Sequence, residues 1–291
     1  MTLKSGPVTV RVPATSANLG PGFDALGMAL SWYDDVTAEV TEVGLTFDIE
    51  GEGADEVPRD ETHLLYRAMV AAFDLLGERP TGLHLTCRNT IPHGRGLGSS
   101  AAAIAAGVFL ARALVIDGEK RLDDEALFRL ATDLEGHPDN VAPALAGGFT
   151  ISWIDGASAE SLRLEVAAEV TVFVPPEPVS TEVARGLLPE SVPHEDAAFS
   201  AGRAALLVAA LVWAPERVLS ATEDRLHQSY RAAAMPDSYK LVQRLRVEGV
   251  PAVISGAGPT VLAFGHGLSD WNPEGWLHRE LQVASRGAHL V

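Results

Sequence analysis

Apolar and polar residues alternate in several short runs of the chain, which is the pattern of half-buried β-strands. Runs of this kind predict strands at residues 8–12, 83–87, 149–153, 170–174, 253–255 and 260–264. A longer run from Val36 to Ile49 alternates on both sides of Gly44 and predicts two strands that pair with each other. The first strand meets Pro13, so a loop is expected to follow it.

Between these strands, apolar residues recur every three or four positions, as on one face of a helix. Asp60 is expected to cap the first such helix and Gly77 to end it. Its apolar stripe consists of Leu65, Met69, Ala72 and Leu76. Further helices are predicted at residues 99–115, 123–135, 181–187, 197–213, 215–231 and 238–248, with a loop at residues 136–140.

The order of these elements predicts an α+β fold, because strands and helices mix irregularly rather than alternating as in a doubly wound α/β sheet. Residues 155–160 are polar and small, and they are the best candidate for a domain boundary. The expected organisation is an N-terminal domain of residues 1–157 and a C-terminal domain of residues 158–291. With 291 residues, 47% of them apolar, the chain can bury cores of that size.

The composition of the chain excludes some classes of binding partner and favours one cellular location. The formal net charge of −17 works against binding to nucleic acid. The longest apolar stretches, Ala101–Ala111 and Ala204–Ala214, are shorter than the roughly 20 residues that span a bilayer, and residues 1–6 show no secretory signal. Cys87 is the only cysteine, which excludes an internal disulfide. We therefore expect an acidic cytoplasmic protein with no nucleic-acid partner and no membrane partner.

The most informative stretch is a glycine-rich turn followed at once by a predicted helix of small residues. Glycines at alternate positions allow several backbone N–H groups to point into one hollow at the start of that helix. Unpaired amides and the positive helix end make an anion site, whose usual occupant is phosphate. Two serines add hydroxyls for a phosphate oxygen or a magnesium ion. The expected phosphate site comprises Pro92, His93, Gly94, Arg95, Gly96, Leu97, Gly98, Ser99, Ser100, Ala101 and Ala102.

Better-known glycine motifs do not fit this turn. The P-loop requires a lysine next to its last glycine, whereas the three lysines of the chain, Lys4, Lys120 and Lys240, all lie elsewhere. The dinucleotide pattern Gly-x-Gly-x-x-Gly also fails, because the third glycine comes one residue early. An oxidoreductase that uses a dinucleotide is therefore disfavoured, and protein-kinase landmarks are absent.

Two further motifs accompany the glycine turn. Residues 10–24 read Val-Arg-Val-Pro-Ala-Thr-Ser-Ala-Asn-Leu-Gly-Pro-Gly-Phe-Asp, and residues 255–260 read Ser-Gly-Ala-Gly-Pro-Thr. In this order, the three motifs resemble those of the GHMP small-molecule kinases, over residues 10–264. The resemblance implies two α+β domains with the active site in the cleft between them, and ATP and Mg²⁺ as cofactors. It also implies that Gly256 and Gly258 let the third motif approach the phosphate loop closely.

Within the GHMP kinases, residues 13–24 and 135–143 are most similar to the branch that phosphorylates the side-chain hydroxyl of L-homoserine. The resemblance implies ATP-dependent formation of O-phospho-L-homoserine, a step towards threonine, with a homodimer as a further expectation. The nearest alternative is a GHMP kinase that acts on a different alcohol. A nucleotide-binding sensor without catalysis is the alternative from another class, and it should lack the metal carboxylate or the substrate anions.

The resemblance also implies roles for individual residues. The amino-acid site is expected to include Asn18, Asp24, His137, Asp139 and Asn140, with Asp24 and Asp139 as the candidate anions for the ammonium. Its carboxylate is expected at Thr181, Arg185 and Arg231, because a guanidinium fork suits a carboxylate. Magnesium is assigned to Glu135 and a loop serine, in the first place Ser99. Asp24, Asp139, Ser99 and Glu135 form the expected catalytic set. The proton acceptor stays open between Asp24 or Asp139 and the transferred phosphate itself, which we favour.

Overall fold

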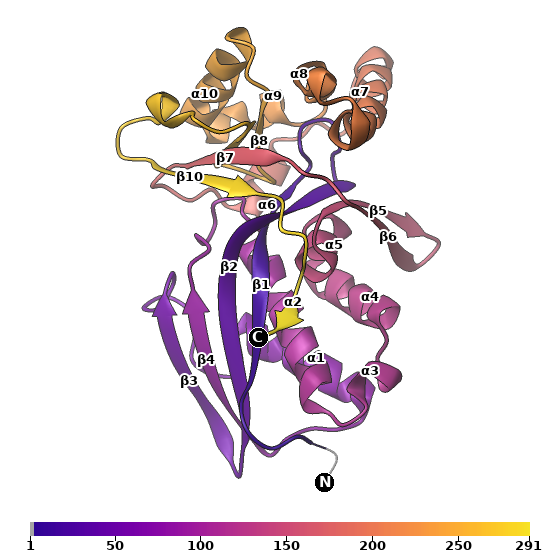
Figure 1. Cartoon of the computed structure of the whole chain (residues 1–291), viewed down its shortest axis with the longest axis vertical. Coiled ribbons are helices and arrows are strands. Elements are labelled where there is room, and N and C mark those ends of the chain that lie inside the picture. Colours follow the sequence, from indigo (N-terminus) through magenta and orange to yellow (C-terminus); the bar gives the residue numbers. More distant parts are fainter. Residues whose placement is uncertain (1–2) are drawn as a thin grey trace.

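The computed structural model describes residues 3–291, which form two sheet-and-helix parts (Figure 1). The first part contains a seven-stranded sheet in the order β11-β1-β2-β4-β3, with β5 paired to β2 and β6 paired to β5. Its strands are β1 (Val8–Ala17), β2 (Leu26–Thr41), β3 (Gly44–Gly51), β4 (Gly82–Asn89), β5 (Phe149–Asp155), β6 (Ser158–Leu164) and β11 (His289–Leu290).

A layer of helices covers one side of this sheet (Figure 1). The helices are α1 (Leu64–Leu76), α2 (Ser99–Leu114), α3 (Gly118–Arg121), α4 (Asp124–Glu135) and α5 (Pro138–Ala146). Helix α2 is buried on nearly all sides, because its alanines let β1, α1 and α4 pack closely around it. The rigid surroundings of α2 fix the position of its N-terminus, where the glycine-rich turn ends.

The second part is built on an antiparallel four-stranded sheet in the order β10-β7-β9-β8. Its strands are β7 (Glu169–Val174), β8 (Ala252–Ile254), β9 (Val261–Phe264) and β10 (Leu277–Gln282), and its helices are α6 (Thr181–Gly186), α7 (His194–Trp213), α8 (Val218–Ala221), α9 (Gln228–Arg231) and α10 (Pro236–Val247). After β10 the chain returns to the first part, where β11 pairs with β1. One apolar core includes residues of both parts, among them Val172, Leu207 and Leu262 of the second.

The α+β class expected from the sequence is confirmed, and most predicted elements are present. Gly77 ends α1 in the left-handed conformation, as predicted, and residues 65, 69, 72 and 76 are buried. The capping residue is wrong, however. His63 caps α1 by accepting the N–H of Leu65, whereas Asp60 accepts hydrogen bonds from Thr62 in the turn before it.

Three further expectations are corrected. Strands β2 and β3 do not pair with each other, because β4 lies between them and pairs with both. The predicted helix at 215–231 is broken, since the Asp224 carboxylate accepts the N–H groups of residues 226–228 and forms a turn between α8 and α9. The loop predicted at 136–140 contains the start of helix α5, with Pro138 at its first position. The boundary expected after residue 157 stays a prediction; that position lies in the turn between β5 and β6.

Helix α7 is long and apolar enough to cross a membrane by length and composition. The sequence-based estimate counted only the stretch up to Ala214, whereas the helix extends back to His194. A single helix of this kind is weak evidence for a membrane span. In the structure α7 packs against α8, and its Arg203 pairs with Glu223.

Candidate active site

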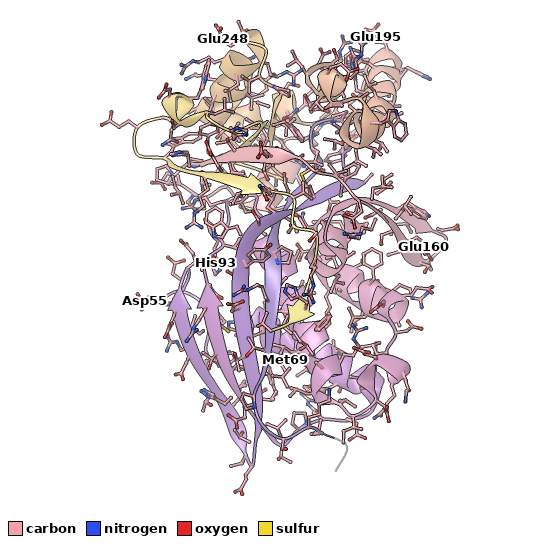
Figure 2. The ribbon with its side chains drawn as sticks, in the orientation of Figure 1. Asp55, Met69, His93, Glu160, Glu195 and Glu248 are labelled. Atoms are coloured by element: carbon pink, nitrogen blue, oxygen red, sulfur yellow. The ribbon has the colours of Figure 1, made fainter. Side chains whose placement is uncertain are left out.

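The three sequence motifs meet at one place, between the two parts of the molecule. The N–H of Thr15 donates to the carbonyl of Leu97 at 3.0 Å, which joins the first motif to the glycine-rich turn. The side-chain amide of Asn18 donates to the carbonyl of Gly256 at 2.9 Å, which joins the first motif to the third. Figure 2 labels His93 of the glycine-rich turn just beyond the arrowheads of β3 and β4.

The carbonyl groups and the N–H groups of the glycine-rich turn differ in their hydrogen bonding. Five consecutive carbonyls, from Gly94 to Gly98, each accept a hydrogen bond from the protein. Their donors are the N–H of Val179, the N–H of Thr260, the hydroxyl of Ser255, the N–H of Thr15 and the N–H of Ala102. Among residues 3–291, by contrast, the N–H groups of residues 96–101 have no protein acceptor. The loop therefore presents unpaired donors on one side, at the positive end of α2.

Two glycines make this arrangement possible. Gly96 and Gly98 have φ angles of +73° and +69°, a region that residues with a side chain rarely adopt. A Cβ on Gly96 would also clash with the carbonyl oxygens of Ser255 and Gly258, which belong to the third motif. A Cβ on Gly98 would clash with the hydroxyl of Thr15. The backbones of all three motifs can therefore approach one another only because these positions lack side chains.

A cavity of about 370 Å³ lies against these free amides. Fourteen of the residues predicted for the site line it. They are Asn18, Gly94, Gly96, Gly98, Ser99, Ser100, Glu135, His137, Asp139, Asn140, Thr181, Arg185, Arg231 and Gly256. Val179 and Ala257 also line the cavity. Ala257 belongs to the third motif but was not predicted for the site, and no sequence signal had singled out Val179.

Some residues predicted for the phosphate site do not line this cavity. Leu97 is fully buried in the core, and Ala101 and Ala102 are buried inside α2. The guanidinium of Arg95 donates to the backbone carbonyls of residues 175 and 176 instead of pointing into the cavity. Further residues outside its wall are Pro92, His93 and Gly258. Of these residues, His93 and Ala102 line a neighbouring cavity instead.

Two arginines, Arg185 and Arg231, line the cavity, whereas Asp24, the ion-pair partner of Arg185, is not part of its wall. Arg185 forms a bidentate ion pair with Asp24, with N···O distances of 2.7 and 3.1 Å. Hydrogen bonding and the charge of Asp24 raise the pKa of Arg185. Arg231 is only 1% exposed and lies over the ring of Phe23. Burial, followed by the nearby charge of Arg185, lowers the pKa of Arg231, so an anion at this position would relieve an unfavourable charge.

His227 holds Arg231 in place, and sequence reasoning missed it. The ring is fully buried, donates from Nε2 to the carbonyl of Gly20 at 2.8 Å, and accepts at Nδ1 from Arg231 at 3.2 Å. Burial lowers the pKa of His227, which favours the neutral ring that this pattern requires. The spacing of four residues between His227 and Arg231 was the only sequence signal that could have pointed to His227.

Carboxylates occupy the side of the cavity next to α2. Glu135, at the end of α4, accepts a hydrogen bond from the hydroxyl of Ser100 at 2.6 Å. Burial raises the pKa of Glu135. His137 donates from Nδ1 to Asp139 at 2.8 Å, and this hydrogen bond raises the pKa of His137. Ser100, rather than Ser99, is therefore the loop serine that contacts the expected metal carboxylate.

A second cavity, of about 320 Å³, adjoins the first through Ser99 and Ser100, which line both. Its wall is mainly apolar and includes His63, Asp34 and Cys87. Burial raises the pKa of the Cys87 thiol to about 12 and that of Asp34 to about 6. A carboxylate that is buried without a cation beside it costs stability when it is ionised.

We expect Asp34→Asn to stabilise the folded protein at neutral pH. The folded-state pKa of about 6 lies above the ordinary value of 3.8, so the wild-type chain loses stability as the pH rises through this range. The amide keeps the backbone hydrogen bonds but does not ionise. Urea unfolding should give the variant about 2 kcal/mol more stability at pH 8 and no advantage at pH 4. Equal stability of Asp34→Asn and the wild-type chain at pH 8 would contradict the expected cost of ionising Asp34.

Comparisons with known proteins bear on the same features. Residues 63–148, from the cap of α1 to the end of the turn after α5, match the N-terminal domain of the GHMP kinases. The homoserine kinase of Streptomyces avermitilis is 59% identical over 99% of this chain and 97% of its own length. The homoserine kinase of Streptomyces coelicolor is 63% identical over 90% of this chain and 85% of its own.

The whole architecture also matches a solved structure. The crystal structure of homoserine kinase from Cytophaga hutchinsonii superposes with a TM-score of 0.84 at 25% identity, covering 100% of this chain and 99% of that one. High identity across both parts of the molecule means that the likeness includes the second part as well as the phosphate loop. The chain therefore belongs to the homoserine kinases of the GHMP kinase family.

Proposed function

We propose that the protein transfers the γ-phosphoryl group of ATP to the side-chain hydroxyl of L-homoserine, giving O-phospho-L-homoserine for threonine biosynthesis. The observation that carries the proposal is the row of unpaired amides at residues 96–101, which lies beside a cavity lined by both basic and acidic side chains, as the carboxylate and ammonium of an amino acid require. Phosphoryl transfer needs mainly positioning and charge neutralisation, and this site supplies both.

The two adjoining cavities suit the two halves of a nucleotide. The apolar cavity lined by Val36, His63 and Leu65 would take the base. Ser99 and Ser100 line both cavities, so the triphosphate would run from the base along the free amides. Because the net charge is −17, long-range attraction does not favour ATP, and local amide dipoles with a cation must provide its binding energy.

The amino acid would occupy the charged end of the 370 Å³ cavity. Its carboxylate would bind Arg185 and Arg231, which line the cavity. Its ammonium would bind Asp24, which is not part of the wall but is the ion-pair partner of Arg185. The existing ion pair between Asp24 and Arg185 would then be replaced by two ion pairs with the substrate. Both polar atoms of the Asn18 side chain are already bonded, to Gly256 and to the N–H of Asp24. Asn18 therefore acts in this proposal by holding Asp24 and the third motif in position.

No side chain is assigned as general base. Asp24 is committed to Arg185 and the ammonium, and Asp139 accepts from His137. The transferred phosphate itself is the acceptor of the hydroxyl proton in this proposal. The residues of the protein contribute by excluding water and aligning the hydroxyl with the phosphate.

Glu135 and Ser100 fit a magnesium site. Magnesium prefers one or two carboxylates together with phosphate oxygens and water, and when bound here it would neutralise charge on the phosphates. Glu135 supplies one carboxylate, and its contact with Ser100 places a hydroxyl next to it. Ser99 remains a further candidate from the sequence.

Glu135→Gln should raise the concentration of free magnesium needed for half-maximal rate by about tenfold or more, because the amide carries no charge. Asp133→Asn, an exposed change on the same helix, is the matched control and should leave this requirement unchanged. Rates are measured at a constant concentration of the magnesium–ATP complex while free magnesium varies. The same magnesium requirement in both variants would remove Glu135 from the metal site.

An acceptor panel tests the proposed reaction. ADP release is compared for homoserine, mevalonate, galactose and no acceptor, and the product is identified by mass spectrometry. We expect rapid release with homoserine alone. A better rate with another alcohol would favour the alternative kinase, and binding without turnover would favour a nucleotide sensor. A cytoplasmic location and a homodimer are part of the same proposal, and sedimentation equilibrium tests the dimer.

A further inference from the structure

The smaller, mainly apolar cavity is lined by one carboxyl group, whose two oxygens differ in their hydrogen bonding. Asp34, on β2, is 6% exposed. Its Oδ1 accepts the backbone N–H groups of Thr90 and Ile91, just before the glycine-rich turn. Among residues 3–291, Oδ2 has no hydrogen-bond partner, and Asp34 lines the cavity. Oδ2 is thus a buried acceptor that is available to an occupant.

Holding the Thr90–Ile91 backbone does not by itself require a charged group. An asparagine oxygen could accept the same two N–H groups without burying a charge. For Asp34, burial raises the pKa to about 6. The neighbouring Asp35 has an ordinary structural role, since it forms a bidentate pair with Arg11. The unpaired, buried carboxyl in a cavity is therefore a candidate for ligand recognition.

The same wall contains a buried donor. His63 accepts the N–H of Leu65 at Nδ1, so the neutral ring carries its proton on Nε2. Burial lowers the pKa of His63, which favours this neutral form. Nε2 has no hydrogen-bond partner among the described residues. Nε2 is itself inaccessible in this structure, so the free group that the cavity wall offers is the Asp34 acceptor, in a largely apolar surface. The exocyclic amine of adenine is a donor that suits such an acceptor.

We propose that Asp34 selects the purine base of the nucleotide, with Oδ2 accepting a hydrogen bond from an exocyclic 6-amino group and disfavouring a 6-oxo group. The proposal rests on the nucleotide binding proposed above. Adenine and hypoxanthine have nearly the same shape, so the difference lies in hydrogen bonding at positions 6 and 1. A carbonyl facing the carboxylate would leave two acceptors opposed in a dry site, which is strongly unfavourable.

Asp34→Asn tests this assignment by exchanging an acceptor for a donor. The N–H groups of Thr90 and Ile91 keep the amide oxygen in the place of Oδ1, so Nδ2 takes the place of Oδ2. The measured quantity is the ratio of kcat/KM with ATP to kcat/KM with ITP at saturating homoserine. We expect this ratio to fall about 100-fold or more in the variant. Asp35→Asn is the matched control and should keep the wild-type ratio.

Binding of ADP and IDP, measured by calorimetry, gives the same comparison without turnover. Asp34→Asn should bind IDP at least as well as ADP, whereas the wild-type protein and Asp35→Asn should prefer ADP. A ratio that stays within threefold of wild type in folded Asp34→Asn would overturn the proposal. If the wild-type protein phosphorylates no acceptor, the proposed reaction fails, while the ADP-to-IDP binding ratio still decides the role of Asp34.

Discussion

Gly96→Ala should abolish phosphoryl transfer while leaving a folded protein. The new methyl group would have to fit against the carbonyl oxygens of Ser255 and Gly258, and these backbone atoms cannot rotate away as a side chain would. Either the third motif or the phosphate loop must move, so the free amides lose their alignment. We expect kcat/KM for ATP to fall about 1,000-fold or more, equivalent to about 4 kcal/mol.

Gly77→Ala is the matched control for this variant. Gly77 has a φ of +66°, similar to that of Gly96, but lies at the end of α1 with no close obstacle to a Cβ. Both variants carry the strain of a side chain in the left-handed region, about 1 kcal/mol. Thermal unfolding should therefore show loss of stability in both, with activity lost only in Gly96→Ala. Activity of Gly96→Ala within tenfold of wild type would contradict the role given to the loop.

Asp24→Asn should mainly weaken homoserine binding. The substitution removes the charge proposed to bind the ammonium and leaves Arg185 without its partner. We expect KM for homoserine to rise about 100-fold, or about 3 kcal/mol, as found when one member of a partly buried charged pair is removed. At saturating homoserine, kcat should stay within about tenfold of wild type, because Asp24 is not the base.

Steady-state kinetics with homoserine varied at saturating ATP separates the two parameters. Asp196→Asn, which breaks the ion pair with Arg225 away from the cavity, is the control and should change neither. A loss of about 1,000-fold or more in kcat would show instead that Asp24 accepts the hydroxyl proton, and the proposed mechanism would then be wrong.

Local signals in the sequence were sufficient for much of the architecture. Gly77 ends α1, and the stripe at residues 65, 69, 72 and 76 is buried, because a helix needs only its own periodicity and a terminating glycine. The pairing of β3 was not predictable in this way. Strand β4 lies between β2 and β3, and its position depends on the crossover through α1 rather than on the alternation within residues 36–49.

The functional site, like the fold, was predictable from the sequence only in part. The glycine spacing predicted an anion hollow, and the structure places unpaired amides at residues 96–101. The sequence could not show that five carbonyls of this loop would be bonded to segments as distant as Val179 and Thr260. It also gave no reason to select Asp34, and for His227 only the spacing of four residues from Arg231, since each acquires its role through burial beside another motif.

The most direct test of the account is the response of individual backbone amides to nucleotide. Nitrogen-15 NMR spectra of the protein are recorded with magnesium and a non-hydrolysable ATP analogue, and separately with magnesium and adenosine. We expect the largest shifts at the N–H groups of residues 96–101 with the triphosphate, and much smaller ones with adenosine. If the triphosphate binds and these six amides do not shift, the phosphate chain lies elsewhere and the account is contradicted.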